Sequence, residues 1–294
     1  MIEIKAPASS GNMGPGFDCM GMAFDVYNTF LAERNDTLLL EGCEERFNNE
    51  DNLFAVAYQR GCQAIGVTDN VHAVFQCGIP VSRGMGSSAA MIAGGLYAAS
   101  ALHGNALTQD QIFQIASEME GHPDNAAPCI FGSLTASAQR EDGSWIHRLL
   151  PVHESWLFTY LIPDFEVTTA EARKILPPSY SRHDAAMNAG HAVLMARALQ
   201  DGDGELLKTA AVDHIHEPYR SQLIHGYSQI RELTETDTGG KMIISGSGST
   251  CLLIHQKPLS GTCIHAVEKM EHHWRILPVR PAEGGTLVRE AVHE

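Results

Sequence analysis

The chain has 294 residues, 44% of them hydrophobic, which is enough to bury one large core or two ordinary ones. Its formal net charge is −15, from 20 Lys and Arg against 35 Asp and Glu. Binding to a nucleic acid or an anionic membrane needs clustered basic residues, so this balance argues against both partners. No apolar run approaches the roughly 20 residues that span a bilayer.

The cysteines and histidines suggest neither disulfides nor a structural metal. The seven cysteines are scattered without a C-x-x-C pair, and the histidines lack H-E-x-x-H spacing. Inert thiols in a reducing cytoplasm are therefore expected. The N-terminus is expected to form a strand and a turn, not a secretory signal.

The first predicted elements are a short strand and an irregular loop. Residues 2–5 alternate like a strand that stops at Pro7. Residues 8–18 contain too much Gly, Pro and Ser for a regular element, and we expect a packed loop that exposes Asn12 and Asp18; a solvated surface loop is the alternative. Further predicted elements are strands at 22–32, 37–41 and 71–77, and a helix over 51–65.

A glycine- and serine-rich turn follows the strand at 71–77 and leads into a small-residue helix over 89–102. The unpaired N–H groups and the dipole at a helix start favour an anion, and Gly84 and Gly86 allow close backbone approach. No lysine follows the glycines, so this is not a Walker A loop. A plain glycine turn is the alternative. The candidate loop comprises Pro80, Val81, Ser82, Arg83, Gly84, Met85, Gly86, Ser87, Ser88, Ala89 and Ala90.

A polar corner is predicted after the next helix. Thr108 and Gln111 form a capping-box pattern that opens the helix. It ends at Glu120, His122 and Asp124 in a turn broken by Gly and Pro. Singly, His122 is an ordinary loop histidine and Asp124 the N-cap of a short helix over 125–130; together these groups suggest a ligand-facing corner. Strands at 131–138 and 145–150 follow.

The pattern changes near residue 156, where we place a domain boundary between 1–155 and 156–294. A strand over 156–162 precedes a short helix that Thr168 and Glu171 cap and that carries Arg173. Arg173 and Arg220 each have an ordinary explanation as surface charges. Helices are predicted at 182–200, 204–216, 218–235 and 260–273, and strands at 241–245, 251–255, 275–279 and 286–289. The order predicts an antiparallel α+β sandwich.

Several separated strings resemble one family across nearly the whole chain. The loop Pro-x-x-x-Gly-Met-Gly-Ser-Ser-Ala-Ala is similar to the nucleotide loop of GHMP kinases. Residues 6–18, 120–128 and 245–250 resemble three motifs of the bacterial homoserine kinases within that superfamily, and residues 167–177 and 219–227 resemble family segments that contain Arg173 and Arg220. The family's usual prolines are replaced by Ser249 and His225, so both turns are expected to be looser.

The resemblance implies a two-domain α+β GHMP fold, with an N-terminal domain like domain 2 of ribosomal protein S5 and a ferredoxin-like C-terminal domain. It implies ATP-dependent phosphorylation of the L-homoserine hydroxyl, on the route to threonine. Arg173 and Arg220 would hold the carboxylate, Asp18 the ammonium, Asn12 would orient the hydroxyl, and His122 would shape the wall. Ser88 and Glu120 would bind Mg²⁺.

The catalytic base stays open, because some relatives have an aspartate where this chain has Asn125. We expect positioning and charge stabilisation to dominate, through Asn12, Glu120 and Arg173, with Asp124 as a reserve base. Residues 52–54 are the segment that we single out for adenine. Relatives suggest a homodimer. The alternatives are a GHMP kinase for another small alcohol, such as mevalonate or a sugar, and a non-catalytic amino-acid or nucleotide sensor.

Overall fold

The structure is a computed structural model that describes residues 1–291. Its first half is built on a seven-stranded sheet in the order β11-β1-β2-β4-β3, with β5 beside β2 and β6 beside β5. Only β3 and β4 pair in parallel among these strands. The strands are β1 Ile2–Ser10, β2 Met20–Asn35, β3 Leu39–Glu41, β4 Asn70–Cys77, β5 Leu134–Gln139, β6 Trp145–Leu150 and β11 Leu287–Glu290.

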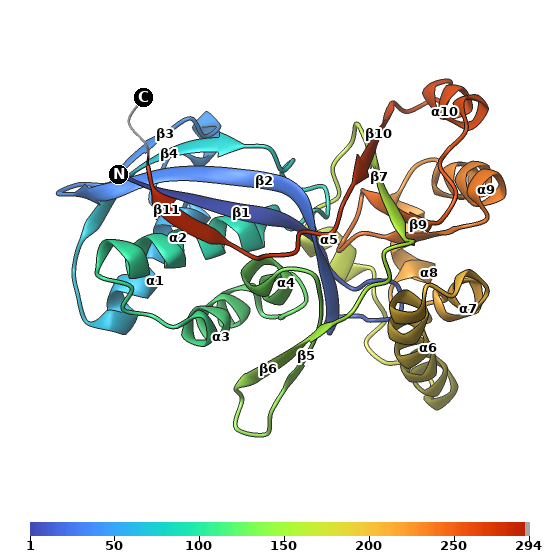
Figure 1. Cartoon of the computed structure of the whole chain (residues 1–294), viewed down its shortest axis with the longest axis horizontal. Coiled ribbons are helices and arrows are strands. Elements are labelled where there is room, and N and C mark those ends of the chain that lie inside the picture. Colours follow the sequence, from blue (N-terminus) through green and yellow to red (C-terminus); the bar gives the residue numbers. More distant parts are fainter. Residues whose placement is uncertain (292–294) are drawn as a thin grey trace.

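Four helices lie on one side of this sheet (Figure 1). Helix α2 consists almost entirely of small apolar residues, so it can be buried on most sides between β1 and α1. The predicted capping box at Thr108 is confirmed at the start of α3. The helices are α1 Leu53–Ile65, α2 Ser87–Leu102, α3 Gln109–Glu120 and α4 Ala126–Phe131, and a short 3₁₀ turn, η1 Glu45–Phe47, precedes them.

The second half contains a four-stranded antiparallel sheet in the order β10-β7-β9-β8. Successive side chains along each strand point to opposite faces of this sheet. Phe158 and Tyr160 on one face contact Phe24 of the large sheet, with ring centroids 5.3 and 5.2 Å apart. The other face packs under α9 and α10. The elements are β7 Leu157–Pro163, β8 Lys241–Ile244, β9 Cys251–His255, β10 Trp274–Val279, α9 Tyr227–Thr238 and α10 Gly261–Glu268.

Among the helices predicted after residue 180, only the one over 182–200 has the expected length. The expected helices over 204–216, 218–235 and 260–273 are wrong in extent. The first ends at Ala210, and Asp213 then holds a separate turn before the next helix, since its Oδ2 accepts the N–H groups of Ile215, His216 and Glu217. The helix predicted over 218–235 is divided in two at Gly226, whose φ is +79°. The helices are α5 Thr169–Lys174, α6 Arg182–Asp201, α7 Gly204–Ala210, α8 Glu217–Arg220 and the 3₁₀ turn η2 Ser221–Leu223.

The N-terminal strand also differs from its prediction. β1 continues through Pro7 to Ser10, because a shift of register between Pro7 and Ala8 accommodates the missing proline N–H. The carbonyl and amide groups of residues 8–10 therefore belong to the sheet, and the loop starts only at Gly11.

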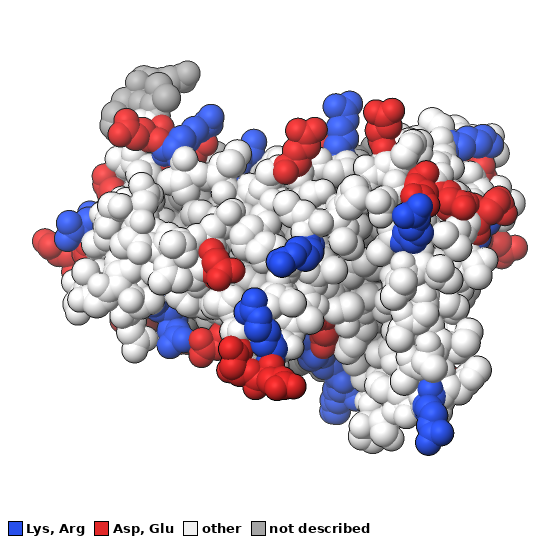
Figure 2. Space-filling model, turned by 60° about the horizontal axis from the view of Figure 1, so that its bottom comes forward, with Lys and Arg blue, Asp and Glu red and all other residues white. Residues whose placement is uncertain are grey.

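We keep 1–155 and 156–294 as a proposed division, since the chain leaves the large sheet before β7. Strand β11 crosses this division by pairing with Ile2–Lys5 of β1. All seven cysteines are free thiols. None of the helices within residues 1–291 has the length and hydropathy to cross a membrane. On the face drawn in Figure 2, basic side chains are scattered among acidic ones.

Candidate active site

A cavity of about 480 Å³ lies between the two halves. The loops that follow β1, β4 and α3 form its first wall, and α5, α8 and the turn after β8 form the second. Of the residues predicted for catalysis, substrate, the nucleotide loop and the metal, only Pro80, Ala89 and Ala90 do not line it; the two alanines are buried in α2. The predicted residues that do line it are Asn12, Asp18, Val81, Ser82, Arg83, Gly84, Met85, Gly86, Ser87, Ser88, Glu120, His122, Asp124, Arg173 and Arg220.

The glycine loop presents the start of α2 to the cavity. Gly86 is the N-cap at φ +70°, and no side chain among the described residues caps this helix end. The N–H groups of the first turn are therefore available to a ligand, and the helix dipole favours an anionic one. Ser87 and Ser88 add hydroxyl groups at the same point.

The same loop is bonded to the second half. The Ser245 hydroxyl donates to the Gly84 carbonyl at 2.7 Å, and the Thr250 N–H donates to the Arg83 carbonyl at 3.1 Å. A Cβ on Gly84, whose φ is +73°, would lie 2.2 Å from the Ser245 carbonyl oxygen. Only glycine lets the backbone at residue 84 come this close to Ser245, so the contact between the two halves requires Gly84.

The Arg83 guanidinium contacts the second half of the chain. Its Nη2 donates to the Asp164 carbonyl at 3.2 Å, and its Nη1 lies 3.5 Å from Glu166. Both partners belong to the segment after β7. Arg83 therefore lines the cavity and contributes to the contact between the halves.

Ser88 and Glu120 bring two oxygen donors together. The Ser88 hydroxyl on α2 donates to Glu120 Oε1 at the end of α3. Burial raises the pKa of Glu120, although the Ser88 hydrogen bond and the His122 charge oppose this shift. A hydroxyl and a carboxylate of this kind are ligands that Mg²⁺ prefers.

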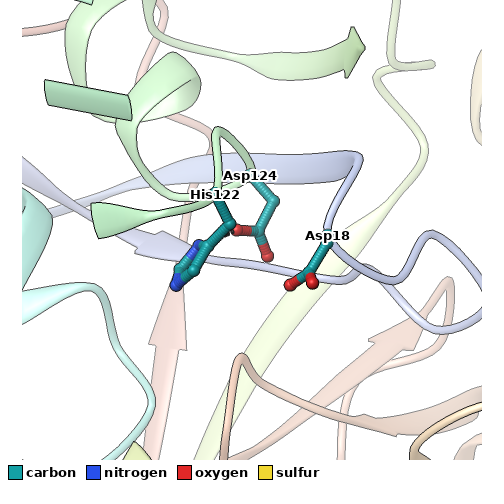
Figure 3. Close-up of side chains that lie close together, drawn as sticks. All are labelled: Asp18, His122 and Asp124. Carbon is teal, nitrogen blue, oxygen red and sulfur yellow. Dashed lines mark hydrogen bonds and ion pairs between the residues drawn. The ribbon is translucent and has the colours of Figure 1, made fainter. Parts of the chain in front are cut away.

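His122 and Asp124 form a close pair beside Asp18 (Figure 3). His122 Nδ1 lies 2.5 Å from Asp124 Oδ1, and Asp124 Oδ2 accepts the N–H of Asn12 at 2.9 Å. Burial opposes ionisation of Asp124, which is 1% exposed, but the hydrogen bond and charge of His122 hold its pKa below the usual value. Both Asp124 oxygens are thus occupied. The predicted N-cap role for Asp124 is wrong, since Asn125 takes that position at α4 without a side-chain bond.

Asn12 fixes the loop after β1. Its Nδ2 donates to the Gly246 carbonyl at 2.7 Å, and its Oδ1 accepts the N–H of Asp18 at 3.0 Å. Asn12 and Asp18 have φ values of +67° and +53°, which few residues other than Asn, Asp and Gly adopt. This local strain lies at the cavity wall, as is common at functional sites.

Two arginines approach from the second half. Arg173 on α5 pairs with Asp18, with 3.0 Å between Nη2 and Oδ1. Arg220 on α8 is 2% exposed, and its guanidinium donates to the carbonyls of Ala172 and Gly246 at 3.1 and 3.0 Å. Burial, together with the charge of Arg173, lowers the pKa of Arg220. No carboxylate within residues 1–291 forms an ion pair with Arg220.

Sequence reasoning missed much of the apolar end of the cavity. Of the segment 52–54, Asn52 and Leu53 line the cavity, whereas Phe54 is buried against Phe30 and Phe75. Asn52 caps α1 by accepting the N–H of Phe54. The residues missed include Phe47, Met91, Ile92, Met119 and Thr169, whose sequence context carries no distinguishing pattern.

The chain is similar to known proteins over part or all of its length. The model of the GHMP kinase N-terminal domain matches residues 52–133, which contain the glycine loop. A homoserine kinase from Clostridium botulinum (strain Okra) is 37% identical over 293 residues, 98% of each chain. One from Trichormus variabilis is 40% identical over 260 residues, 86% of each. A crystal structure of homoserine kinase from Cytophaga hutchinsonii matches with a TM-score of 0.85 and 26% identity, covering 98% of this chain and 97% of that one.

The glycine loop, the two-domain α+β architecture and the domain match define a GHMP kinase. The fold class predicted from the sequence is thereby confirmed. Within that class, the identity over nearly the full length places the chain in the homoserine kinase family.

Proposed function

We propose that the protein transfers the γ-phosphoryl group of ATP to the hydroxyl of L-homoserine, giving ADP, O-phospho-L-homoserine and a proton, on the route to threonine. The observation that carries this proposal is Arg220. It is buried at the cavity wall without a carboxylate partner among the described residues, so an anionic ligand group would complete its pairing. Arg173 and Asp18 lie in the same cavity and complement a carboxylate and an ammonium.

Substrate entry requires an exchange of partners at Asp18 and Arg173. In this structure the two side chains pair with each other. An amino-acid zwitterion supplies an ammonium for Asp18 and a carboxylate for Arg173 and Arg220. The exchange conserves charge pairing, and this favours an amino-acid acceptor over mevalonate or a sugar.

The nucleotide would occupy the remainder of the cavity. The uncapped start of α2 and the backbone of residues 81–86 suit its phosphates, as the family resemblance implies. Apolar side chains of Leu53, Met91 and Met119 offer a surface for the base.

Ser88 and Glu120 fit a Mg²⁺ ion, because they place a hydroxyl and a carboxylate together beside the phosphate loop. A bound Mg²⁺ would neutralise charge on the β- and γ-phosphates. Glu120 would hold the ion through a carboxylate oxygen and Ser88 through its hydroxyl oxygen.

The chain's own groups favour catalysis by positioning. Asp124 is engaged at both oxygens, and Asn125 Oδ1 accepts the Ser9 hydroxyl, so neither is a free base. Asn12, Glu120 and Arg173 would instead orient the reactants and balance charge. Asp124 stays the reserve base. If Asp124→Asn turns over at nearly the wild-type rate at every pH, that reserve role is excluded.

The experiment that tests the proposal is coupled ADP release with Mg·ATP and a panel of acceptors: L-homoserine, L-serine, L-threonine, mevalonate and galactose. We expect a strong preference for L-homoserine. Turnover with a non-amino-acid alcohol would overturn the substrate but keep the kinase. Tight ATP binding without any turnover would favour the sensor.

We also propose that the protein is a cytoplasmic homodimer, as its relatives suggest. The free thiols and the acidic surface are compatible with that compartment. Light scattering on the eluted protein would give the mass, and a monomer at all concentrations would contradict the dimer.

A further inference from the structure

His216 is a buried histidine to which the proposed reaction assigns no role. It is fully buried and precedes α8, the helix that carries Arg220. Both of its ring nitrogens have a partner. Nε2 lies 2.9 Å from the carbonyl oxygen of Gly14, and Nδ1 lies 3.5 Å from Nη1 of Arg220. The imidazole therefore connects the loop after β1, in the first half, with an arginine of the second half.

The two partners determine where the imidazole carries its proton. A carbonyl oxygen only accepts hydrogen bonds, so Nε2 carries the hydrogen and donates it to Gly14. A guanidinium only donates, so Nδ1 offers its lone pair to Arg220. Burial lowers the pKa of His216; the Asp213 carboxylate opposes this shift, and the positive charge of Arg220 adds to it. The ring is therefore neutral, with its hydrogen on Nε2.

The guanidinium of Arg220 is held along one edge. Its Nε donates to the Ala172 carbonyl at 3.1 Å, and its Nη1 contacts both the Gly246 carbonyl, at 3.0 Å, and His216. Within residues 1–291 no group forms a hydrogen bond with Nη2. Because the guanidinium is planar and rigid, fixing Nε and Nη1 also fixes the direction of Nη2. Nη2 is the nitrogen that remains for a ligand in the cavity that Arg220 lines.

A neutral imidazole holds Arg220 without cancelling its charge. A carboxylate at the same place would form an ion pair with the guanidinium and compete with an anionic ligand. A protonated imidazole would repel Arg220 and would have no lone pair to offer. Neutral His216 avoids both effects, so Arg220 keeps its charge for the ligand.

The bond to Gly14 relates Arg220 to the opposite wall of the cavity. Gly14 lies in the loop that presents Asp18 to the cavity. Phe17 of the same loop packs against both partners, since its ring centroid is 5.5 Å from that of His216 and 5.3 Å from Cζ of Arg220. These contacts hold Arg220 in place relative to Asp18.

We infer that His216 is a positioning residue for substrate recognition. Its neutral imidazole orients Arg220 so that Nη2 meets the carboxylate of the acceptor, at a set distance from the Asp18 carboxylate that would bind the ammonium. This inference rests on the proposed function, and it explains how the cavity would distinguish an amino acid from an alcohol without a carboxylate.

Two substitutions separate the two bonds of the imidazole. The amide nitrogen of Gln reaches the position of Nε2, so His216→Gln keeps the donor to Gly14 and removes the acceptor for Arg220. The amide oxygen of Asn lies near the position of Nδ1, so His216→Asn keeps the acceptor and removes the donor. We expect His216→Gln to raise KM for L-homoserine at least about tenfold with kcat changed by less than about threefold, and His216→Asn to keep KM within about threefold of the wild type.

Initial rates of ADP release measure both constants, and thermal unfolding verifies that each variant is folded. A purely structural role would affect the two variants alike, because each loses one hydrogen bond and part of the ring's packing. Equal rises in KM for His216→Gln and His216→Asn would therefore overturn the inference.

An acceptor without a carboxylate gives a second readout. The kcat/KM of His216→Gln for 3-amino-1-propanol should stay within about threefold of the wild-type value, because this acceptor has no carboxylate for Arg220. Equal losses for 3-amino-1-propanol and L-homoserine would overturn the inference alone. A wild-type protein that does not turn over L-homoserine would overturn the proposed function as well.

The protonation of His216 can be measured in the wild type, without any substitution. Nitrogen-15 NMR distinguishes the two neutral forms of an imidazole from the charged one, and contact with the Phe17 ring identifies His216. We expect a neutral ring with its hydrogen on Nε2 at the pH of the assay. A hydrogen on Nδ1 would overturn the inference, since Nδ1 could not then accept from Arg220.

Discussion

Arg220 and Arg173 illustrate how two residues of one type differ in physical state. Arg220 is buried and bonded only to uncharged groups, so its charge is not balanced locally. Arg173 is partly exposed and pairs with Asp18, so its charge is already balanced and screened by solvent. An incoming carboxylate would therefore gain most from Arg220, and Arg173 would adjust by exchanging partners.

Replacing Arg173 with Gln should lower kcat/KM for L-homoserine by about tenfold to a hundredfold, because a charge-assisted hydrogen bond is lost. The fold should survive, because Arg173 is partly exposed. Initial rates of ADP release would measure the change. Arg60→Gln is the matched control, since Arg60 pairs with Glu118 on the surface. Equal losses in the two variants would argue against a substrate role for Arg173.

Glu120→Gln should raise the Mg²⁺ concentration needed for half-maximal activity by at least about tenfold, because an amide is a weaker ligand than a carboxylate. The titration would be repeated on Glu118→Gln, which changes a surface carboxylate two residues away. An unchanged Mg²⁺ requirement in Glu120→Gln would remove Glu120 from the metal site.

Glu217 predicts a pH dependence of stability. Burial raises the pKa of this carboxyl from 4.5 to about 7, while its Oε1 accepts the Ile244 N–H at 2.7 Å. Between these two pH values the folded protein holds a proton that the unfolded chain releases. Stability is therefore lost as pH rises from about 4.5 to 7, by an amount on the order of 3 kcal/mol.

Glu217→Gln keeps the hydrogen-bond acceptor and removes the ionisation. Its unfolding free energy relative to the wild type should increase between pH 4.5 and pH 8. Urea unfolding at both pH values would measure this, with the exposed Glu232→Gln as control. Parallel pH profiles for Glu217→Gln and the wild type would contradict the shift.

At the scale of elements, patterns with local causes were predicted well. The capping boxes at Thr108 and Thr168 start α3 and α5 as expected, because both partners lie within four residues. The breaks after α7 and α8 were missed. Between α7 and α8 the Asp213 carboxylate accepts the N–H groups of residues 215–217 and holds them in a turn, and helical periodicity alone does not reveal such a turn.

The two glycines of the loop are needed for different structural reasons. Gly86 serves the start of α2, whereas Gly84 serves contact with the second half. Gly84→Ala should therefore destabilise the protein by more than the ~1–2 kcal/mol expected for alanine at a positive φ. Gly104→Ala is the matched control, since Gly104 has φ +79° and open space around it. Thermal unfolding of both would separate strain from contact, and equal shifts would contradict the contact.

At the scale of the molecule, the resemblance located the candidate residues in the sequence, and the structure brings them into one cavity. Asn12, Asp124, Arg173 and Gly246 come from four distant segments, and only the packing of two sheets brings them together. The hydrogen-bond partners of the site residues could not be predicted from the sequence. The bonds from Asn12 to Gly246 and from Arg220 to Ala172 depend on where whole elements stop.

Long-range pairing also escaped the sequence. The last predicted strand near 286–289 exists as β11, but nothing local indicates that it joins β1. Such contacts couple the halves, together with the aromatic group of Phe24, Phe158 and Tyr160. The cavity thus lies between halves that share a core.

The most direct test of the account compares kcat/KM for L-homoserine with the values for 3-amino-1-propanol and 4-hydroxybutanoate. The first analogue lacks the carboxylate assigned to Arg220 and Arg173, and the second lacks the ammonium assigned to Asp18. We predict that each analogue loses at least about a hundredfold, because a charged group of the cavity is left unpaired. Equal kcat/KM for all three acceptors would contradict the recognition of an amino acid at this site.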